Sequence, residues 1–182
     1  WIQFVAQVVV AAAAVALAMG EGQRPSEHYG AIVWPIAWAL FYLRLHWEDR
    51  AGLRAPYPEI VHVAGLWLVT AMVAVEVALQ FDRIAGDGWY FAAWGALPAL
   101  ALWLVLQYKM RWPMRAAPFA YAKLGAPGLA AFLLGWILFT SVRTTGDAAP
   151  LPYIPLLSPL DIATLLALSA VLRWHLEDHR DE

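Results

Sequence analysis

The sequence predicts an all-α integral membrane protein, with residues 1–182 forming a single bundle of about six transmembrane helices. Composition is the first reason: 62% of the 182 residues are hydrophobic and 14% are charged, whereas soluble domains are roughly 45–50% apolar and about 25% charged. Long apolar runs are the second reason, and the uneven placement of Lys and Arg between them is the third. This composition excludes an ordinary soluble enzyme, a disordered segment and a nucleic-acid binder.

Six apolar runs are candidates for spanning helices. A helix needs about 20 residues to cross about 30 Å of hydrocarbon. The runs also lack the alternation of apolar and polar residues that marks a strand. In order they cover residues 2–19, which are uncharged; 29–45, which are short and contain Pro35; 60–81, which contain Glu76; 89–108, with Pro98 near the middle; 124 or 127 to 142; and 159–176.

The basic residues predict the orientation of these helices. Nine of the 12 Lys and Arg residues follow the second, fourth and sixth runs, and the other three, Arg24, Arg83 and Arg143, follow the first, third and fifth. Cytoplasmic loops carry an excess of positive charge. We therefore expect both termini in the cytoplasm and the connections containing Arg24, Arg83 and Arg143 outside. Because the chain starts at Trp1, inside an apolar run, we expect it to be part of a longer protein.

Glu76 is the candidate catalytic residue, because it is an acid inside an expected span. Intramembrane acids usually face a bundle interior or a water-filled cavity, and they are often functional. The alternative is a structural Glu that is protonated or paired with Arg83 or Arg143. The position near the outer end of its helix keeps both interpretations open.

A proline-rich connection precedes the last expected helix. Pro152, Tyr153 and Pro155 lie in it, and the four prolines up to Pro159 prevent helix formation before that residue. Ser158 suits the N-cap, Pro159 the first helical position, and Asp161 the position that closes a capping box. Because irregular apolar backbone must be buried at membrane depth, we expect this extended outer segment to dock on protein or to form the rim of a substrate cavity. Its candidate contacts for a substrate or partner include Arg143, Asp147 and Asp161.

Small residues predict a helix-packing face on the fifth expected helix. Gly128, Ala131 and Gly135 share one side of it, and small residues at this spacing let helices approach closely. Trp34 and Trp38 likewise share a face, for which packing is the favoured interpretation.

The histidines and the basic connection complete the candidates. His46 and His62 lie near the inner ends of expected helices, so we weighed haem ligation; none is at mid-membrane, and an interfacial position is favoured. No cofactor and no metal site is predicted, and the absence of Cys excludes thiolate ligands and a cysteine nucleophile. Residues 108–123 interleave basic and aromatic side chains, which suits contact with anionic headgroups rather than nucleic acid.

Three stretches resemble a known family. Residues 147–168 read DAAPLPYIPLLSPLDIATLLAL, residues 62–80 read HVAGLWLVTAMVAVEVALQ, and Trp112 is followed by Pro113. In this order they are similar to the C-terminal region of large bacterial multi-pass membrane proteins, domain-of-unknown-function family 2339, although the family pattern has Asn where this chain has Ser158. The resemblance implies a bacterial membrane location and further helices upstream. It implies no activity.

Two functions from different classes follow. The first is a non-catalytic transmembrane module of a larger bacterial inner-membrane (envelope) protein, in contact with the lipid bilayer and with upstream helices of the same protein or other membrane subunits. The second is a transporter or membrane-embedded transferase that acts on a lipid-linked or small polar substrate from the outer face and uses Glu76 as proton carrier or base. We rank the module first.

Overall fold

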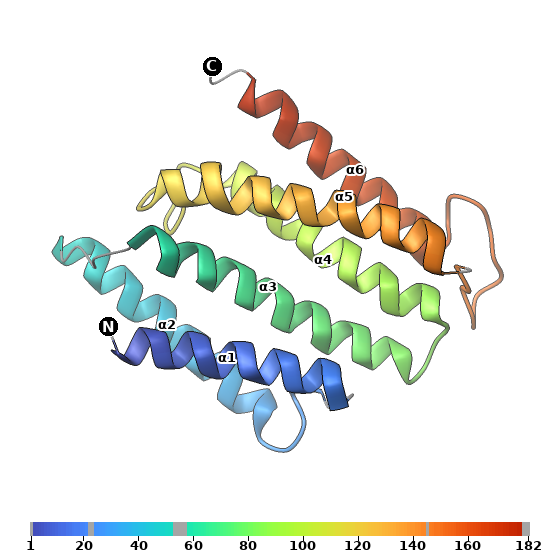
Figure 1. The fold of residues 1–182 in the computed structure, drawn as a ribbon, viewed down its shortest axis with the longest axis horizontal. Coiled ribbons are helices and arrows are strands. Elements are labelled where there is room, and N and C mark those ends of the chain that lie inside the picture. Colours follow the sequence, from blue (N-terminus) through green and yellow to red (C-terminus); the bar gives the residue numbers. More distant parts are fainter. Residues whose placement is uncertain (1, 22–23, 53–57, 145, 180–182) are drawn as a thin grey trace.

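Six α-helices, which run alternately in opposite directions, make up the computed structural model of the chain (Figure 1). The structure describes residues 2–21, 24–52, 58–144 and 146–179, and no strand occurs among them. The all-α prediction is therefore confirmed. The helices are α1 (Ile2–Glu21), α2 (Gly30–Ala51), α3 (Pro58–Asp82), α4 (Asp87–Gln107), α5 (Ala126–Arg143) and α6 (Pro159–Asp178), with a π-helix, η1 (Ala120–Gly125), before α5.

Four stretches of the described residues are long and apolar enough to cross a membrane. They are Glu59–Asp82, Asp87–Gln107, Ala120–Arg143 and Pro159–Asp178. Membrane insertion of α1 and α2 stays a prediction. The polar last turn of α2, with Glu48 and Arg50, extends beyond the apolar run expected there and stops at Gly52, whose φ of 64° ends the helix.

The alternation of the helices places their ends in two groups. Helices α1, α3 and α5 end at the right of Figure 1, and α2, α4 and α6 end at the left. Arg24 and Arg83, which follow α1 and α3, and Arg143, the last residue of α5, therefore share one end of the bundle. The start of α1 and the end of α6 lie at the opposite end.

Helix α4 forms the centre of the bundle. It packs against α6, α3 and α5, and α1 packs on the far side of α3 (Figure 1). Its buried face consists of small residues with a few larger ones, among them Gly95, Ala99 and Leu102, and it meets Leu133 and Trp136 of α5. Because small side chains let backbones approach closely, this face allows α4 to contact three neighbours at once.

The fifth helical segment starts earlier than the apolar run predicts. Helical structure begins at Ala120 with the π-helix, in which the N–H of Ala126 bonds to the carbonyl of Tyr121 five residues before it. Pro127 has no N–H, and in a regular α-helix its ring would contact the carbonyl of Lys123. The wider π-turn avoids that contact and continues directly into α5.

The first part of the proline-rich connection is attached to the turn between α3 and α4 and to the start of α4. The N–H groups of Gly86 and Gly88 bond to the carbonyls of Ala149 (2.9 Å) and Asp147 (3.0 Å), and Trp89 Nε1 donates to the carbonyl of Ala148. Residues 151–157 are all exposed. The docking expected for these seven residues is thus not made by the part of the chain that the structure describes.

Candidate functional site

The carboxylate of Glu76 joins α3 to the connection between α1 and α2. Its Oε2 accepts the backbone N–H of Ser26 at 2.8 Å, and its Oε1 accepts the Ser26 hydroxyl at 2.6 Å. Gln80, one turn further along α3, donates its amide to the same Oε1 at 2.7 Å. Three donors from this chain therefore satisfy the carboxylate.

The pairing of Glu76 with Arg83 or Arg143, considered from the sequence, is not the one observed. Arg83 instead bonds to Glu27, which also contacts Arg24 at 3.5 Å. The Arg83 guanidinium beside Glu27 holds the pKa of that carboxyl below its usual value. The physical reason is local: the turn at Ser26 places two donors on Glu76 and leaves Glu27 facing Arg83.

A pocket of about 410 Å³ opens beside this carboxylate, between α2 and α3. Trp34, Trp38 and Met72 supply its apolar walls, and Ser26, Glu76 and Gln80 supply its polar side. The indole N–H of Trp38 donates to the sulfur of Met72 at 3.3 Å, in line with packing as the favoured role of this tryptophan. The pocket could hold an apolar or amphipathic group next to an already satisfied carboxylate.

The outer contact candidates lie elsewhere. Arg143, Asp147 and Asp161, named from the sequence as contacts for a substrate or partner, do not line this pocket. Asp147 Oδ1 accepts the N–H of Ala149 at 3.0 Å. Pro152, Tyr153 and Pro155 belong to the exposed residues 151–157. These candidates are thus separated from Glu76.

The cap of α6 differs from a regular capping box in one bond. Ser158 occupies the N-cap and its hydroxyl accepts the N–H of Asp161 at 3.1 Å, with Pro159 at the first helical position. Asp161 Oδ2 accepts the N–H of Leu156 at 3.1 Å, whereas a capping box would direct it to the N–H of Ser158. Leu156 has a φ of 69°, and this turn brings its N–H to the start of the helix.

The small residues of α5 divide into two environments. A Cβ on Gly128 would lie 2.8 Å from the ring of Trp67 on α3, so Gly128 packs inside the bundle. A Cβ on Gly135 would have no neighbour within 4 Å, and Ala131 is exposed. Gly135 lies instead in a groove of about 530 Å³ whose walls are the aromatic rings of Tyr90, Phe91, Trp94, Phe132, Trp136 and Phe139.

A second polar cluster, at the end of the bundle where α2 finishes, was missed by sequence reasoning. His62 is 1% exposed, so its side chain is buried inside the bundle, and its expected position at the level of the membrane interface stays a prediction. Its Nδ1 lies 3.2 Å from the hydroxyl of Tyr121, and its Nε2 lies 3.4 Å from Asp49 Oδ1. Asp49 Oδ2 also accepts the indole N–H of Trp112 at 2.8 Å. The four residues come from α2, α3, η1 and the α4–η1 connection.

His46 stands beside this cluster without joining it. Its ring meets the Trp112 ring edge-on, with centroids 4.8 Å apart, and within the described residues its buried Nδ1 has no hydrogen-bond partner. Groups of three or more potential metal ligands are absent from the residues that the structure describes. The cluster can hold or relay a proton along Asp49, His62 and Tyr121.

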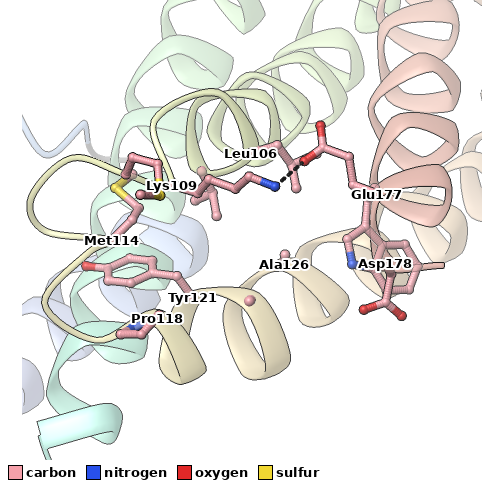
Figure 2. A pocket seen from close by; sticks show the side chains of 12 residues that line it. Leu106, Lys109, Met114, Pro118, Tyr121, Ala126, Glu177 and Asp178 are labelled. Atoms are coloured by element: carbon pink, nitrogen blue, oxygen red, sulfur yellow. Dashed lines mark hydrogen bonds and ion pairs between the residues drawn. The ribbon is translucent and has the colours of Figure 1, made fainter. Parts of the chain in front are cut away.

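Tyr121 also forms the wall of a pocket of about 240 Å³ between the ends of α4 and α6. Figure 2 shows Tyr121 and Met114 on the side opposite Glu177 and Asp178. Lys109 reaches across to Glu177 Oε2 at 3.5 Å, and Lys123 pairs with Asp178 at 2.9 Å. These charges pair with one another at the rim, which fixes the end of α6 to the π-helix and to the end of α4.

Helices of this length and hydropathy, with polar clusters towards the bundle ends and an apolar exterior, define a multi-pass helical membrane protein. The chain belongs to the family described as predicted membrane protein (DUF2339), whose family model matches residues 1–182. The resemblance noted from the sequence is therefore confirmed. No curated protein and no solved structure matches the chain.

Proposed function

We propose that the chain is a non-catalytic transmembrane module of a larger protein of the bacterial inner membrane. The observation that carries this proposal is the bonding of Glu76: its carboxylate accepts from Ser26 N, Ser26 Oγ and Gln80 Nε2. A carboxylate satisfied by three donors of its own chain holds elements together. A proton carrier needs a carboxylate that can exchange its proton with a substrate or water.

The distribution of positive charge supports an orientation with both termini in the cytoplasm. Lys109, Arg111, Arg115 and Lys123 lie between α4 and α5, at the same end as the start of α1 and the end of α6. Cytoplasmic connections carry most of the Lys and Arg of multi-pass proteins. This orientation places Glu76 towards the outer face.

The open part of α5 is the surface we propose for contact with other helices, upstream in the same protein or in other membrane subunits. Gly135 leaves free space on the helix, and aromatic rings border the groove around it. Backbones approach closely at such small residues, which is how helices associate in a bilayer.

The substitution Glu76→Gln tests the structural role. The glutamine oxygen can accept from Ser26 N, and its amide can donate to the Ser26 hydroxyl once that hydroxyl rotates and to Gln80 once the Gln80 amide flips. We expect Glu76→Gln to keep the amount of full-length protein in the membrane and its thermal midpoint. Glu76→Leu, which removes all three bonds, should lower the stability by about 1–3 kcal/mol. Equal losses in both variants would contradict this role.

The pocket beside Glu76 supports the alternative, a transporter or transferase that works from the outer face. Val73 is exposed and lines this pocket without touching the hydrogen bonds of Glu76. A Val73→Cys variant of the full-length protein, with other cysteines removed, separates the two functions in intact cells. Protection from a membrane-impermeant maleimide, while Asp87→Cys reacts, agrees with a lipid-filled pocket and the module. Reaction at both positions would favour a water-filled path to Glu76.

A further inference from the structure

Residues 151–157, here called the apolar loop, present bare hydrophobic side chains at the end of the bundle that carries Arg83 and Arg143. Leu156 is 68% exposed and Leu157 64%. No charged residue occurs between Asp147 and Asp161. Seven consecutive exposed residues of this kind would be unfavourable in water, because apolar area stays hydrated.

The backbone of this loop has few N–H groups left to hydrate. Pro150, Pro152, Pro155 and Pro159 have none. The N–H of Leu151 bonds to the carbonyl of Ala148 at 3.0 Å, that of Leu157 to the carbonyl of Ile154 at 3.0 Å, and that of Leu156 to Asp161 Oδ2 at 3.1 Å. Lipid-exposed irregular backbone is not tolerated in the hydrocarbon region, but at the interface water and headgroups can still reach the remaining carbonyls of the loop.

The loop is also continuous with the surface that faces lipid. On α5, which leads into the connection, Leu138 is 71% and Val142 84% exposed. On α6, which leaves it, Ile162 and Leu165 are exposed as well. Both helices belong to stretches able to cross a membrane. The apolar loop therefore joins two lipid-facing surfaces at one end of the bundle, where Asp147 and Asp161 mark the polar level.

We propose that the apolar loop inserts into the interfacial region of the lipid leaflet at this end of the bundle. Leu151, Ile154, Leu156 and Leu157 enter the boundary between headgroups and acyl chains, and Tyr153 lies with its ring among them and its hydroxyl at the headgroups. The attachment of residues 147–149 to Gly86 and Gly88 fixes the depth of the loop relative to α4. The partner of this surface is thus lipid, whereas the sequence alone favoured docking on protein.

The test uses the full-length protein, free of other cysteines and reconstituted in liposomes of phosphatidylethanolamine and phosphatidylglycerol. Tyr153→Cys and Leu157→Cys are labelled separately with the fluorophore NBD. The matched control is Asp87→Cys, an exposed polar position at the same end of the bundle. Thermal midpoints equal to that of the unsubstituted protein identify folded variants, and two independent loop positions guard against a local defect.

If the loop is inserted, nitroxide-labelled lipid with its label near the headgroup quenches NBD at positions 153 and 157 more strongly than at position 87. Aqueous iodide then shows the reverse order, and NBD emission at the loop positions is shifted to the blue. Iodide quenching as strong at 153 and 157 as at 87 would overturn the proposal, because the loop would lie in water. Protection from both quenchers would also overturn it, because a protein partner would then cover the loop.

Discussion

Ser26 donates two hydrogen bonds to the single carboxylate of Glu76, one from its backbone N–H at 2.8 Å and one from its hydroxyl at 2.6 Å. The two residues are 50 positions apart. Through them the connection between α1 and α2 is attached near the end of α3. Because both bonds are short and reach from one residue to one carboxyl group, this contact helps to determine where α2 starts relative to α3.

Replacing Ser26 by Ala should weaken this attachment. The variant loses the hydroxyl bond to Glu76 but keeps the backbone bond, and Gln80 still donates to the same oxygen, so we expect the free energy of unfolding to fall by about 0.5–1.5 kcal/mol. Ser141→Ala is the matched control, since the Ser141 hydroxyl bonds only locally, to the carbonyl of Ile137 within α5. Thermal unfolding of the full-length protein in nanodiscs measures both. A midpoint equal to that of the control would contradict a structural role for the Ser26 hydroxyl.

Tyr121→Phe should destabilise the opposite end of the bundle. The substitution removes the hydroxyl 3.2 Å from His62 Nδ1 and leaves a buried ring nitrogen without its partner. Such a loss costs about 1–3 kcal/mol. Tyr153→Phe, at an exposed position, controls for loss of a tyrosine hydroxyl. Hydrogen exchange of the α3 amides near His62 should rise in the first variant alone; unchanged exchange there would show that the cluster does not stabilise α3.

Two glycines should respond differently to a single added methyl group as far as packing within this chain is concerned. A Cβ on Gly95 would lie 2.4–2.6 Å from three ring atoms of the buried Trp136, whereas one on Gly135 would meet nothing within 4 Å. Overpacking typically costs about 1–3 kcal/mol, so Gly95→Ala should lower the thermal midpoint. Gly135→Ala should leave the packing within this chain unchanged, so any loss it causes in the full-length protein reports on a further helix packed against this groove. A similar loss in both would mean that another surface already covers Gly135.

The contact between Glu27 and Arg83 predicts a dependence of stability on pH. The Arg83 hydrogen bond lowers the pKa of Glu27 from its usual 4.5. A carboxyl with a lowered pKa in the folded state stabilises the protein above its unfolded pKa, and this contribution disappears as the pH falls through the folded pKa. The difference in thermal midpoint between the unsubstituted protein and Glu27→Gln should therefore stay constant from neutral pH to about 4.5, decrease as the pH falls further, and vanish below the folded pKa. A difference that persists in strong acid would exclude this ion pair as its source.

The six helices could be predicted from the sequence because each apolar run is nearly as long as a bilayer is thick. The start of the last helix at Pro159 could also be predicted, since Ser158 and Pro159 are local signals. The positions at which helices end in polar residues were predicted less well. Helix α2 continues to Ala51, because the signal that ends it is Gly52 in the left-handed conformation and not the end of the apolar run.

The candidate site could be predicted only in part. Glu76 attracts attention as an acid in an apolar run, but its partner Ser26 lies in a polar turn, and hydropathy says nothing about which turn meets which helix. The contact of His62 with Asp49 and Tyr121 brings together α2, α3 and η1, across 13 and 59 positions of the sequence, and hydropathy does not show which of these polar ends meet. Tyr121 also stands in a π-helix, a conformation that apolar periodicity does not reveal.

The π-helix before α5 changes the direction in which side chains point along one continuous helical segment. Residues of the π-helix are rotated about the helix axis relative to residues of α5. An α-helix advances about 100° per residue, and a π-turn inserts about one extra residue into the helix. The wide turn thus rotates Tyr121 relative to Leu129, Leu133 and Trp136. One helical segment can therefore contact two neighbouring helices. The hydroxyl of Tyr121 meets His62 of α3, and the indole N–H of Trp136 donates to the carbonyl of Phe91 in α4. Deleting one residue within Ala120–Gly125 would remove this rotation and turn the tyrosine away from the histidine while the α4 contacts stay in place.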